Sequence, residues 1–454
     1  MDTLNLLWKL SRFMGNTRKT PEAIRELQEQ KLRRLLAHAW EHSPWHRRRF
    51  EAAGITAETL RTAPLSAFPT MDKAQLLAHF DELVTVPGLT QEAIRAFDAA
   101  GTADRTPFLG KYHVVHSSGS TGEPGYFLYD GDAWETMLLG IIRGALWGMT
   151  IPQILRLLAG RPRILYIAAT DGRYGGAMAV GDGIDGVGAS QLYLDIKTPL
   201  SQWVEQVRSF RPNLIIGYPS AVKILAELAQ QGEVSLKVSR VVTCGEPLGA
   251  SLRKFLEDTL GAEVVNFYGA SESLALGAEI DPAVGMQLFD DLNIIEEGPD
   301  GVYLTCLYNF AQPLIRYRLT DRIALDGPAG DCPFSRAAGL LGRSEDVLWF
   351  EDGEGRREFL HPLAVEGFCI PDLTDYQFRQ TGPASFEMLA QTRQGAAFDP
   401  IRRELERQLA AILLEKGLSY VSFRVVLAAE IRPDPRTGKK PLILPIGGKE
   451  GAAK

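Results

Sequence analysis

The sequence predicts an α/β fold with two parts, a large N-terminal domain of helix-covered sheets and a small C-terminal α+β domain. Three observations predict it. After residue 117, short apolar runs bounded by turn residues alternate with helical stretches, which is typical of a parallel sheet covered by helices. A region richer in glycine and aspartate follows Asp281. The chain has 454 residues, enough for two or more domains with ample cores. We place the domains at residues 1–342 and 343–454.

The individual elements follow from periodicity. The first third of the chain is predicted to be helical, most clearly over residues 21–41, where apolar residues recur at i, i+3 and i+4. Further helices are predicted over residues 200–210, 221–231, 248–260 and 401–413. Strands are predicted over residues 164–168, 214–217, 241–244, 264–267 and 422–428. Two more strands, 293–296 and 302–307, are expected to pair through the turn sequence at 298–301.

Composition excludes several classes of function. The net charge of −7 and a pI near 5.7 disfavour nonspecific binding of nucleic acid. No apolar run approaches the length of a membrane span, and residues 1–19 lack the order of a signal peptide. The four cysteines are far apart in sequence, so neither a zinc ribbon nor a disulfide framework is indicated. We therefore expect a cytoplasmic protein that uses no nucleic acid and no membrane.

A Ser/Gly-rich segment is the most informative local feature. Residues 117–124 read Ser-Ser-Gly-Ser-Thr-Gly-Glu-Pro and follow the apolar-leaning residues 112–115. A strand that enters such a loop presents backbone N–H groups and hydroxyls to one small volume, which suits a polyanion such as a triphosphate. The spacing and the lysine of a Walker A loop are absent. The alternative is a plain Ser/Gly turn. The candidate phosphate-binding residues are Ser117, Ser118, Gly119, Ser120, Thr121 and Gly122.

Further motifs follow in a characteristic order. They are Asn266-Phe267-Tyr268-Gly269-Ala270-Ser271-Glu272, Tyr317-Arg318-Leu319-Thr320-Asp321, Gly342-Arg343-Ser344-Glu345-Asp346 and Arg436-Thr437-Gly438-Lys439-Lys440. Their order and spacing resemble the adenylate-forming superfamily. Three segments look most like its phenylacetate–CoA ligase and coenzyme F390 synthetase-like branch: Ile315-Arg316-Tyr317-Arg318, Gly245-Glu246-Pro247 and Gly217-Tyr218-Pro219-Ser220. The resemblance extends from about Leu32 to the C-terminus.

The resemblance implies a reaction. A carboxylic acid would be joined to the α-phosphate of ATP, with release of pyrophosphate, and the acyl group would pass from the adenylate to coenzyme A. The implied cofactors are ATP, Mg²⁺ and coenzyme A. Glu272 matches the position of the family's magnesium ligand, Ser271 would contact the α-phosphate, and Tyr268 would lie near the adenine. Without the family context, Glu272 reads equally well as a carboxylate at a helix N-terminus.

The remaining motifs imply further roles. Asp321 matches the ribose-binding aspartate, since a carboxylate can accept hydrogen bonds from two hydroxyls. Arg343 is the second expected nucleotide contact, and Glu345 is the expected hinge of a mobile C-terminal domain. Lys439 aligns with the catalytic lysine, with Lys440 as the alternative. The other expected nucleotide-binding residues are Gly245, Glu246, Pro247, Asn266, Phe267 and Gly269.

The carboxylate pocket is defined less well. Six residues near predicted strand ends could line it for an aryl or other compact acid, although core tyrosines are an equal alternative. They are Tyr166, Thr170, Tyr174, Gly217, Tyr218 and Pro219.

One departure from the family pattern concerns the acyl acceptor. A charged insertion at residues 351–357 precedes Phe359-Leu360-His361-Pro362, the nearest match to an Asn-Val-Phe-Pro-like stretch of phenylacetate-type ligases. That region faces the thiol site in relatives. A carrier-protein thiol, an amine or a hydroxyl therefore stands as an alternative acceptor to coenzyme A. A non-catalytic nucleotide-binding protein is a further alternative, and a homodimer is left open.

Overall fold

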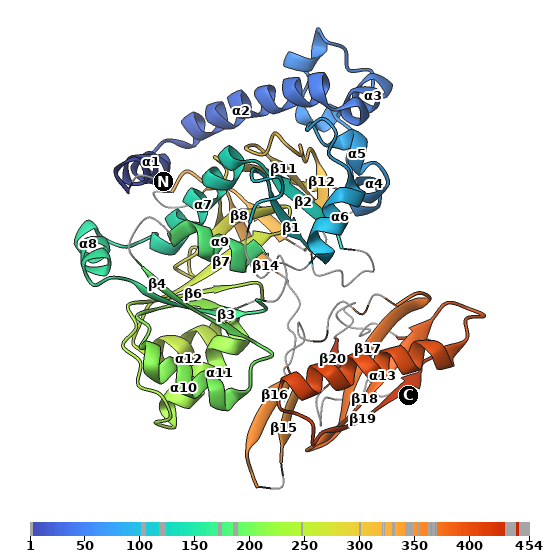
Figure 1. Ribbon diagram of the computed structural model, residues 1–454. Coiled ribbons are helices and arrows are strands. Elements are labelled where there is room, and N and C mark those ends of the chain that lie inside the picture. The colour runs from blue at the N-terminus through green and yellow to red at the C-terminus, as the bar shows by residue number, and fades with distance from the viewer. Residues whose placement is uncertain are drawn as a thin grey trace, which may run out of the picture.

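The central element of this computed structural model is a nine-stranded mixed sheet (Figure 1). Its strand order is β13-β14-β9-β8-β7-β6-β5-β3-β4. The structure describes residues 3–100, 106–117, 124–170, 175–184, 189–246, 248–298, 301–319, 321, 323–328, 332–340, 348–352, 354–360, 365, 368, 370–431 and 442–444. Most of the predicted Ser/Gly loop (residues 118–122), the predicted domain boundary at 342/343 and the expected hinge at Glu345 lie outside the described residues.

One half of the sheet is parallel. Its strands are β3 (Arg163–Ala168), β4 (Ser190–Asp195), β5 (Leu214–Gly217), β6 (Arg240–Cys244) and β7 (Val264–Ala270). The predicted strands of the alternating region are confirmed within a few residues. Strands that are buried on both faces have nearly continuous apolar sequences, and this is why these strands could be predicted.

The other half is antiparallel and was not predicted. It contains β8 (Ser273–Glu279), β9 (Met286–Leu288), β13 (Ile323–Asp326) and β14 (Arg336–Leu340). Strands β7 and β8 form a hairpin, so the chain turns directly from the last parallel strand into the antiparallel half.

Helices cover both faces of the sheet (Figure 1). One face carries α10 (Leu200–Phe210), α11 (Pro219–Gln230) and α12 (Ala250–Leu260), and the other carries α7 (Gly131–Leu146) and α9 (Gly175–Ile184). Helix α8 (Ile151–Ala159) joins α7 to β3. Helix α7 packs closely on the sheet because Gly144 faces Phe267; a Cβ at Gly144 would lie 2.6 Å from that ring. The three helix predictions of this region are confirmed.

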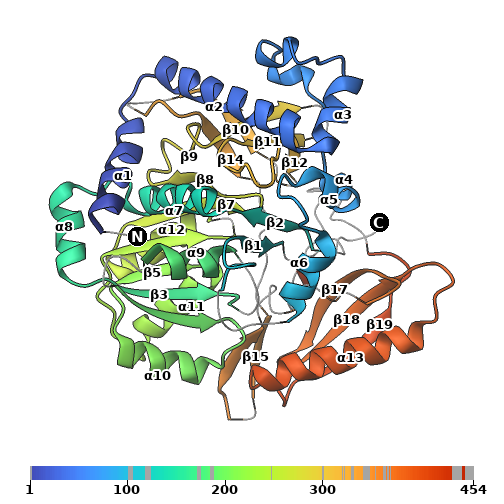
Figure 2. The same ribbon diagram turned by 45° about the horizontal axis from the view of Figure 1, so that its top comes forward.

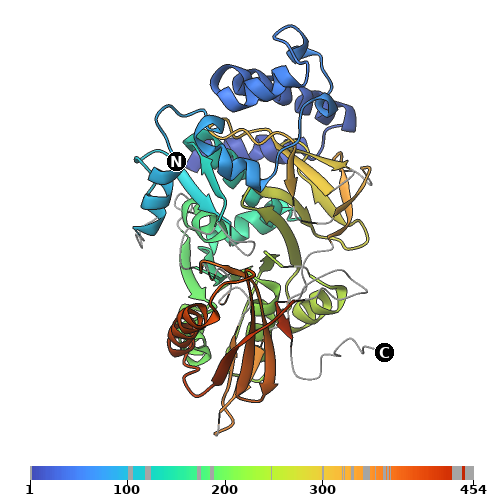
Figure 3. The ribbon, with the colours of Figure 1, turned by 90° about the vertical axis from the view of Figure 1, so that its right-hand side faces the viewer.

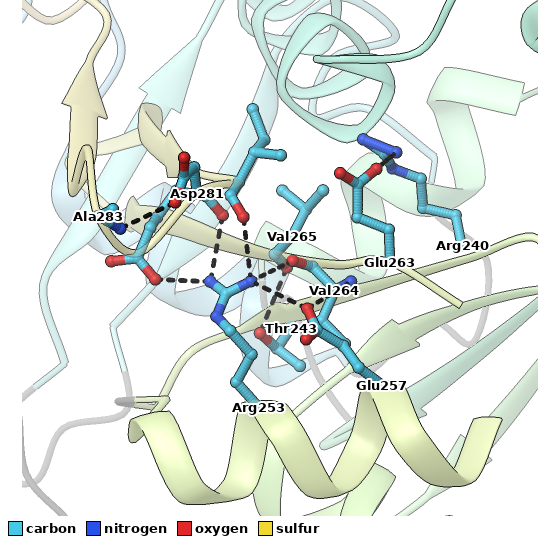
Figure 4. Close-up of polar contacts among 11 residues, drawn as sticks. Arg240, Thr243, Arg253, Glu257, Glu263, Val264, Val265, Asp281 and Ala283 are labelled. Carbon is cyan, nitrogen blue, oxygen red and sulfur yellow. Dashed lines mark hydrogen bonds and ion pairs between the residues drawn. The ribbon is translucent and has the colours of Figure 1, made fainter. Parts of the chain in front are cut away.

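Arg253 fastens helix α12 to the sheet (Figure 4). Its guanidinium donates to the backbone oxygen of Val264 in β7 and, at 2.5 Å, to the carboxylate of Glu279 in β8. Glu257, one turn further along α12, lies 3.6 Å away. A planar guanidinium with several donors suits this junction, because it satisfies the ends of two strands at once.

The N-terminal third forms a helical layer over the antiparallel half (Figure 2). Its elements are α1 (Thr3–Asn16), α2 (Pro21–His42), α3 (Pro44–Ala52), η1 (Thr59–Arg61), η2 (Leu65–Ala67), α4 (Lys73–Ala78), α5 (Phe80–Leu83) and α6 (Gln91–Ala99). The prediction of a helical first third is confirmed over residues 3–99, whereas residues 113–116 and 126–129 form strands.

A buried ion pair anchors this layer. Arg143 of α7 donates to both carboxylate oxygens of Asp291 at 2.6 and 2.9 Å, and both side chains are buried. Asn16 and Lys31 also donate to Asp291. Burial would raise the pKa of the Asp291 carboxyl, but Arg143, Lys31 and Asn16 together outweigh it and hold the pKa below its usual value.

Two small sheets complete the N-terminal region. Strands β1 (His113–His116) and β2 (Tyr126–Tyr129) form an antiparallel hairpin. Strands β10 (Asn293–Gly298), β11 (Gly301–Cys306) and β12 (Tyr317–Leu319) form a three-stranded sheet, which confirms the predicted pair around the turn at 298–301. Met71 bridges to Tyr317 and exchanges backbone hydrogen bonds with Arg316 and Arg318.

The C-terminal region has its own sheet, covered by one helix (Figure 3). Its elements are β15 (Leu348–Glu351), β16 (Arg357–Leu360), β17 (Leu373–Gly382), β18 (Ser385–Thr392), α13 (Phe398–Glu415), β19 (Ser422–Leu427) and β20 (Ile443–Leu444). The predicted helix and strand of this region are confirmed. The charged insertion is the turn of the β15–β16 hairpin, where Arg356 lies 2.8 Å from Asp352.

Candidate functional site

The predicted magnesium ligand lies on a hairpin turn. Ala270 of β7 pairs with Ser273 of β8, which leaves Ser271 and Glu272 as the two turn residues. The alternative interpretation of Glu272 as a helix-capping carboxylate is wrong, since a strand follows it. Gly269 is required here, because a Cβ at that position would lie 2.4 Å from the oxygen of Leu274.

The base of the Ser/Gly loop lies beside this turn. The Ser271 hydroxyl donates to the backbone oxygen of His116 at 3.3 Å, and the Tyr129 hydroxyl donates to the oxygen of Ser271 at 2.8 Å. Ser117 closes the β1–β2 hairpin: its N–H donates to the oxygen of Gly125, and its hydroxyl accepts from the Gly125 N–H at 2.8 Å. Two motifs separated by about 150 residues therefore meet.

The predicted ribose ligand belongs to the same cluster. The Tyr268 hydroxyl donates to the Asp321 carboxylate at 2.7 Å, and the Tyr317 hydroxyl hydrogen-bonds to the Glu272 carboxylate. The structure thus brings together Ser117, Tyr268, Ser271, Glu272 and Asp321. All five were predicted from sequence to serve one nucleotide.

The electrostatics of Glu272 are unusual. Burial raises the pKa of its carboxyl to about 7, and the nearby Asp321 carboxylate adds to the shift; the Tyr317 hydroxyl and Lys73 oppose it. Burial also raises the pKa of Tyr268, and Asp321 adds to that shift. Ionising the partly buried Glu272 carboxyl costs free energy. A divalent cation beside it would stabilise the ionised form.

Lys73 was missed by sequence reasoning. It is the first residue of α4, and the bridge from Met71 to Tyr317 brings it to the cluster. Its charge acts on Glu272 across almost two hundred residues of sequence. No local pattern signals such a contact, because a lysine at the start of a helix is usually solvated.

A second group of predicted residues gathers at the ends of β5 and β6. Glu246 accepts hydrogen bonds from the N–H and the hydroxyl of Ser220, both at 3.0 Å, at the start of α11. Gly245 has a φ of +79°, and a Cβ there would lie 2.7 Å from the Tyr218 ring. Glycine is therefore required on both counts. Pro219 begins α11, and Gly217 ends β5.

The predicted acid pocket is described only in part. Tyr166 is 2% exposed and lies in the core, where a Cβ at Gly176 would come within 2.4 Å of its hydroxyl. Thr170 follows β3, and both its N–H and its hydroxyl donate to the Asp195 carboxylate, at 2.6 and 2.7 Å.

Two residues expected at the nucleotide lie elsewhere on β7. Phe267 packs under α7 with its ring centre 6.1 Å from that of Phe289, and Asn266 is buried within the sheet. The remaining candidates lie outside the described residues. They are Ser118, Gly119, Ser120, Thr121, Gly122, Tyr174, Pro247, Arg343, Glu345, Lys439 and Lys440.

Within the described ranges, no group of three or more histidine, cysteine, aspartate or glutamate side chains is placed to hold a metal ion. Among the described helices, none is both long and apolar enough to cross a bilayer.

Comparison with known proteins identifies the class. A family profile described as "AMP-binding enzyme" matches residues 186–292. Phenylacetate–coenzyme A ligases of Escherichia coli and Thermus thermophilus are each 27% identical, over 351 and 380 residues. The first match covers 72% of both chains, and the second covers 78% of this chain and 77% of the relative. The indoleacetate–lysine synthetase of Pseudomonas savastanoi is 31% identical over 136 residues, which is 29% of this chain and 34% of that protein.

Solved structures agree on the fold. A 2-hydroxyisobutyryl-CoA ligase in complex with 2-HIB-AMP and CoA, in its thioesterification state, superposes with a TM-score of 0.62 and 20% identity. The match covers 95% of this chain and 91% of that one. The AMP-binding match and the phenylacetate–coenzyme A ligase relatives support the predicted likeness to the adenylate-forming superfamily. Within that superfamily the relatives support the predicted phenylacetate–CoA ligase-like branch, and the predicted fold class is confirmed.

Proposed function

We propose that this protein is an AMP-forming acid–coenzyme A ligase that activates an aryl or other compact carboxylic acid. The observation that carries the proposal is the Ser271–Glu272 turn, which lies against the base of the Ser/Gly loop and is tied through Tyr317 and Tyr268 to Asp321. The relatives named for phenylacetate and coenzyme A support the reaction class.

Each nucleotide group has a candidate partner. The Ser117–Gly122 loop would donate hydrogen bonds to the triphosphate, with Ser271 beside it. Asp321 would accept from the ribose hydroxyls, and Tyr268, which already donates to Asp321, would hold that carboxylate in place. Arg343 would provide a further nucleotide contact. Negative charge on the two reactants is the main obstacle, so positioning and charge compensation would supply most of the rate.

Magnesium fits the chemistry of Glu272. Mg²⁺ prefers hard oxygen ligands and usually takes only one or two carboxylates, with phosphate oxygens and water completing its shell. The Glu272 carboxyl has a raised pKa of about 7, so it would gain a stabilising counter-charge from the ion. The bound ion would offset charge on the phosphates.

The C-terminal region would complete the reaction. Lys439 would place its charge between the carboxylate and the α-phosphate, as a mobile lysine can. We place the domain boundary at 342/343, with Glu345 as the hinge of a movement between the two half-reactions. Thr170, Tyr174 and Tyr218 are the proposed contacts of the acid, together with Gly217 and Pro219; Tyr166 would support the pocket from the core.

Transfer to an amine is the second candidate. The local match to indoleacetate–lysine synthetase favours it, although that match spans only about a third of that protein. The β15–β16 hairpin, with its charged turn at residues 351–357, lies in the region expected to face the acceptor.

The deciding experiment separates activation from transfer. Purified protein is given ATP, Mg²⁺ and a panel of aryl and short carboxylic acids, and pyrophosphate release is followed with coenzyme A, with lysine, or with neither. We expect one class of acid to give pyrophosphate, and coenzyme A to produce a thioester and increase turnover. An amide product with lysine and no thioester would favour the second candidate. No acid-dependent pyrophosphate with any acid, from folded protein that binds ATP, would favour a non-catalytic nucleotide-binding role.

A further inference from the structure

A buried lysine joins the end of helix α13 to the start of helix α10. The Lys416 side chain has no exposed surface, and its Nζ donates to the backbone oxygen of Thr198 at 2.5 Å. The Glu358 carboxylate lies 3.2 Å from Nζ, and the Phe359 ring centre lies 3.7 Å from it. An ammonium group remains buried only where such partners replace water, so this contact selects one arrangement of the two segments.

The same glutamate caps helix α10. Helix α10 begins at Leu200, and the preceding Pro199 provides no side-chain acceptor for the free N–H groups. The Leu200 N–H donates instead to the second carboxylate oxygen of Glu358, at 2.5 Å. The first N–H groups of a helix have no acceptor within the helix. For α10 the acceptor comes from β16 in the C-terminal region. Separating the two segments would leave the Leu200 N–H without this acceptor.

The turn that Lys416 contacts also holds Thr170. The Asp195 carboxylate, at the end of β4, accepts from the N–H and hydroxyl of Thr170 through one oxygen. Its other oxygen accepts from the Lys197 N–H at 2.8 Å. The Asp195 backbone oxygen accepts from the N–H of Thr198 at 2.9 Å and from the Trp203 indole at 3.2 Å. Residues 195–200 are therefore ordered from both sides.

An aromatic contact reinforces the junction. The Trp203 ring meets the Phe359 ring edge to face, with centres 5.1 Å apart, and both side chains are fully buried. Gly417 lies beside Pro199, since a Cβ at Gly417 would be 3.5 Å from the proline ring. The hydrophobic core of the parallel sheet thus continues into the C-terminal sheet at this place.

We propose that Lys416 and Glu358 are positioning residues: they dock the C-terminal region on the turn at 195–200, and through Asp195 they hold Thr170 at the mouth of the acid pocket. Acid binding and docking of the C-terminal region then favour each other, since both order the same turn. The link to acid binding rests on the function proposed above, whereas the docking contact does not.

Hydrogen exchange tests the docking contact without any substrate. Lys416→Met keeps the length of the side chain and removes its charge. Arg356→Met is the matched control, since it breaks an exposed ion pair in the β15–β16 hairpin, which carries Glu358. In the full-length protein, amides of residues 196–203 should exchange about tenfold faster in Lys416→Met, while those of residues 293–306 are unchanged. Equal exchange at 196–203 in Lys416→Met and the wild type would overturn the proposal.

Glu358→Gln is the second variant and keeps the shape of the junction. It should accelerate exchange at the same peptide, because an amide oxygen is a weaker acceptor for Leu200 and a weaker partner for Lys416. If Lys416→Met does not fold, this variant alone decides: faster exchange at 196–203 supports the contact, and unchanged exchange refutes it.

Kinetics test the connection to the acid. With an acid that the wild type activates, both variants should raise the KM for that acid about tenfold in pyrophosphate exchange and leave kcat within about twofold. Thr170→Val should reproduce the KM change, because it removes the hydroxyl that Asp195 holds. Faster hydrogen exchange at residues 196–203 together with an unchanged KM for the acid would overturn the connection to Thr170. A wild type that activates no acid would defeat the proposed function, while hydrogen exchange would still decide the docking contact.

Discussion

Replacing Glu272 by glutamine should stabilise the free protein and impair its catalysis. Burial and Asp321 raise the pKa of the Glu272 carboxyl from 4.5 to about 7, so the folded protein holds this proton more tightly than the unfolded chain does. Stability is therefore lost as the pH rises from 4.5 to 7, and it stays lower above that range. The shift corresponds to about 3 kcal/mol, or about half of that once partial solvent screening is allowed for.

Glutamine keeps the shape of this side chain and still accepts from Tyr317. The Glu272→Gln variant should therefore melt at nearly the same temperature as the wild type at pH 5 and at a higher temperature at pH 8. In pyrophosphate release, the same variant should need much more Mg²⁺ and turn over more slowly, because it lacks the charge that holds the ion.

The assay is a series of thermal melts at closely spaced pH values, run beside a magnesium titration of activity. A melting difference that is the same at pH 5 and pH 8 would refute the argument from burial. An unchanged magnesium requirement would remove Glu272 from the metal site, whatever the melts show. Adding Mg²⁺-ATP should narrow the difference at pH 8, since only the wild type gains a counter-charge at this carboxylate.

Three other substitutions test separate parts of the site. Gly245→Ala should lower the melting temperature more than Gly261→Ala, since both positions have positive φ but only a Cβ at Gly245 would come within 2.7 Å of a tyrosine ring. Lys73→Met should shift the pH dependence of magnesium-supported activity upward, because it removes a positive charge that lowers the pKa of the Glu272 carboxyl; an unshifted profile would contradict this. Lys439→Ala should reduce acid-dependent pyrophosphate release by roughly 10²-fold with little change in ATP binding, whereas Lys440→Ala should not. The reverse result would place the catalytic lysine one residue later.

The sequence predicted four of the five parallel strands, all except β4, but none of the antiparallel half. The strands from β3 to β7 are flanked by helices on both faces, so their apolar runs are continuous and bounded by turn residues. Strand β9 has only three residues, and β8 reads Ser-Leu-Ala-Leu-Gly-Ala-Glu, which favours a helix by local propensity. Pairing with β7 overrides that propensity, and this is why the helix-capping alternative for Glu272 failed.

The candidate site was predictable to the extent that its residues lie in contiguous motifs. Tyr268, Ser271 and Asp321 were found because the motifs carry them, and the structure brings them together. Lys73 and Asp195 could not be found in this way. Each acts through a contact with a segment far away in sequence or on a neighbouring strand, and nothing in its immediate surroundings marks it.

The bridge between Met71 and Tyr317 has a consequence for how the protein is made. Arg316 reaches back to the oxygen of Ser66, a separation of 250 residues, and the same crossing brings Lys73 to Glu272. During synthesis, the segment around Met71 therefore has no partner strand until the ribosome has translated β12. At elongation rates of about 5–20 residues per second, this interval lasts about 12 to 50 s. The apolar faces of the early helices are exposed during that interval. Slow or interrupted translation between residues 71 and 317 would lengthen the period in which the chain depends on chaperones, while leaving the finished enzyme unaltered.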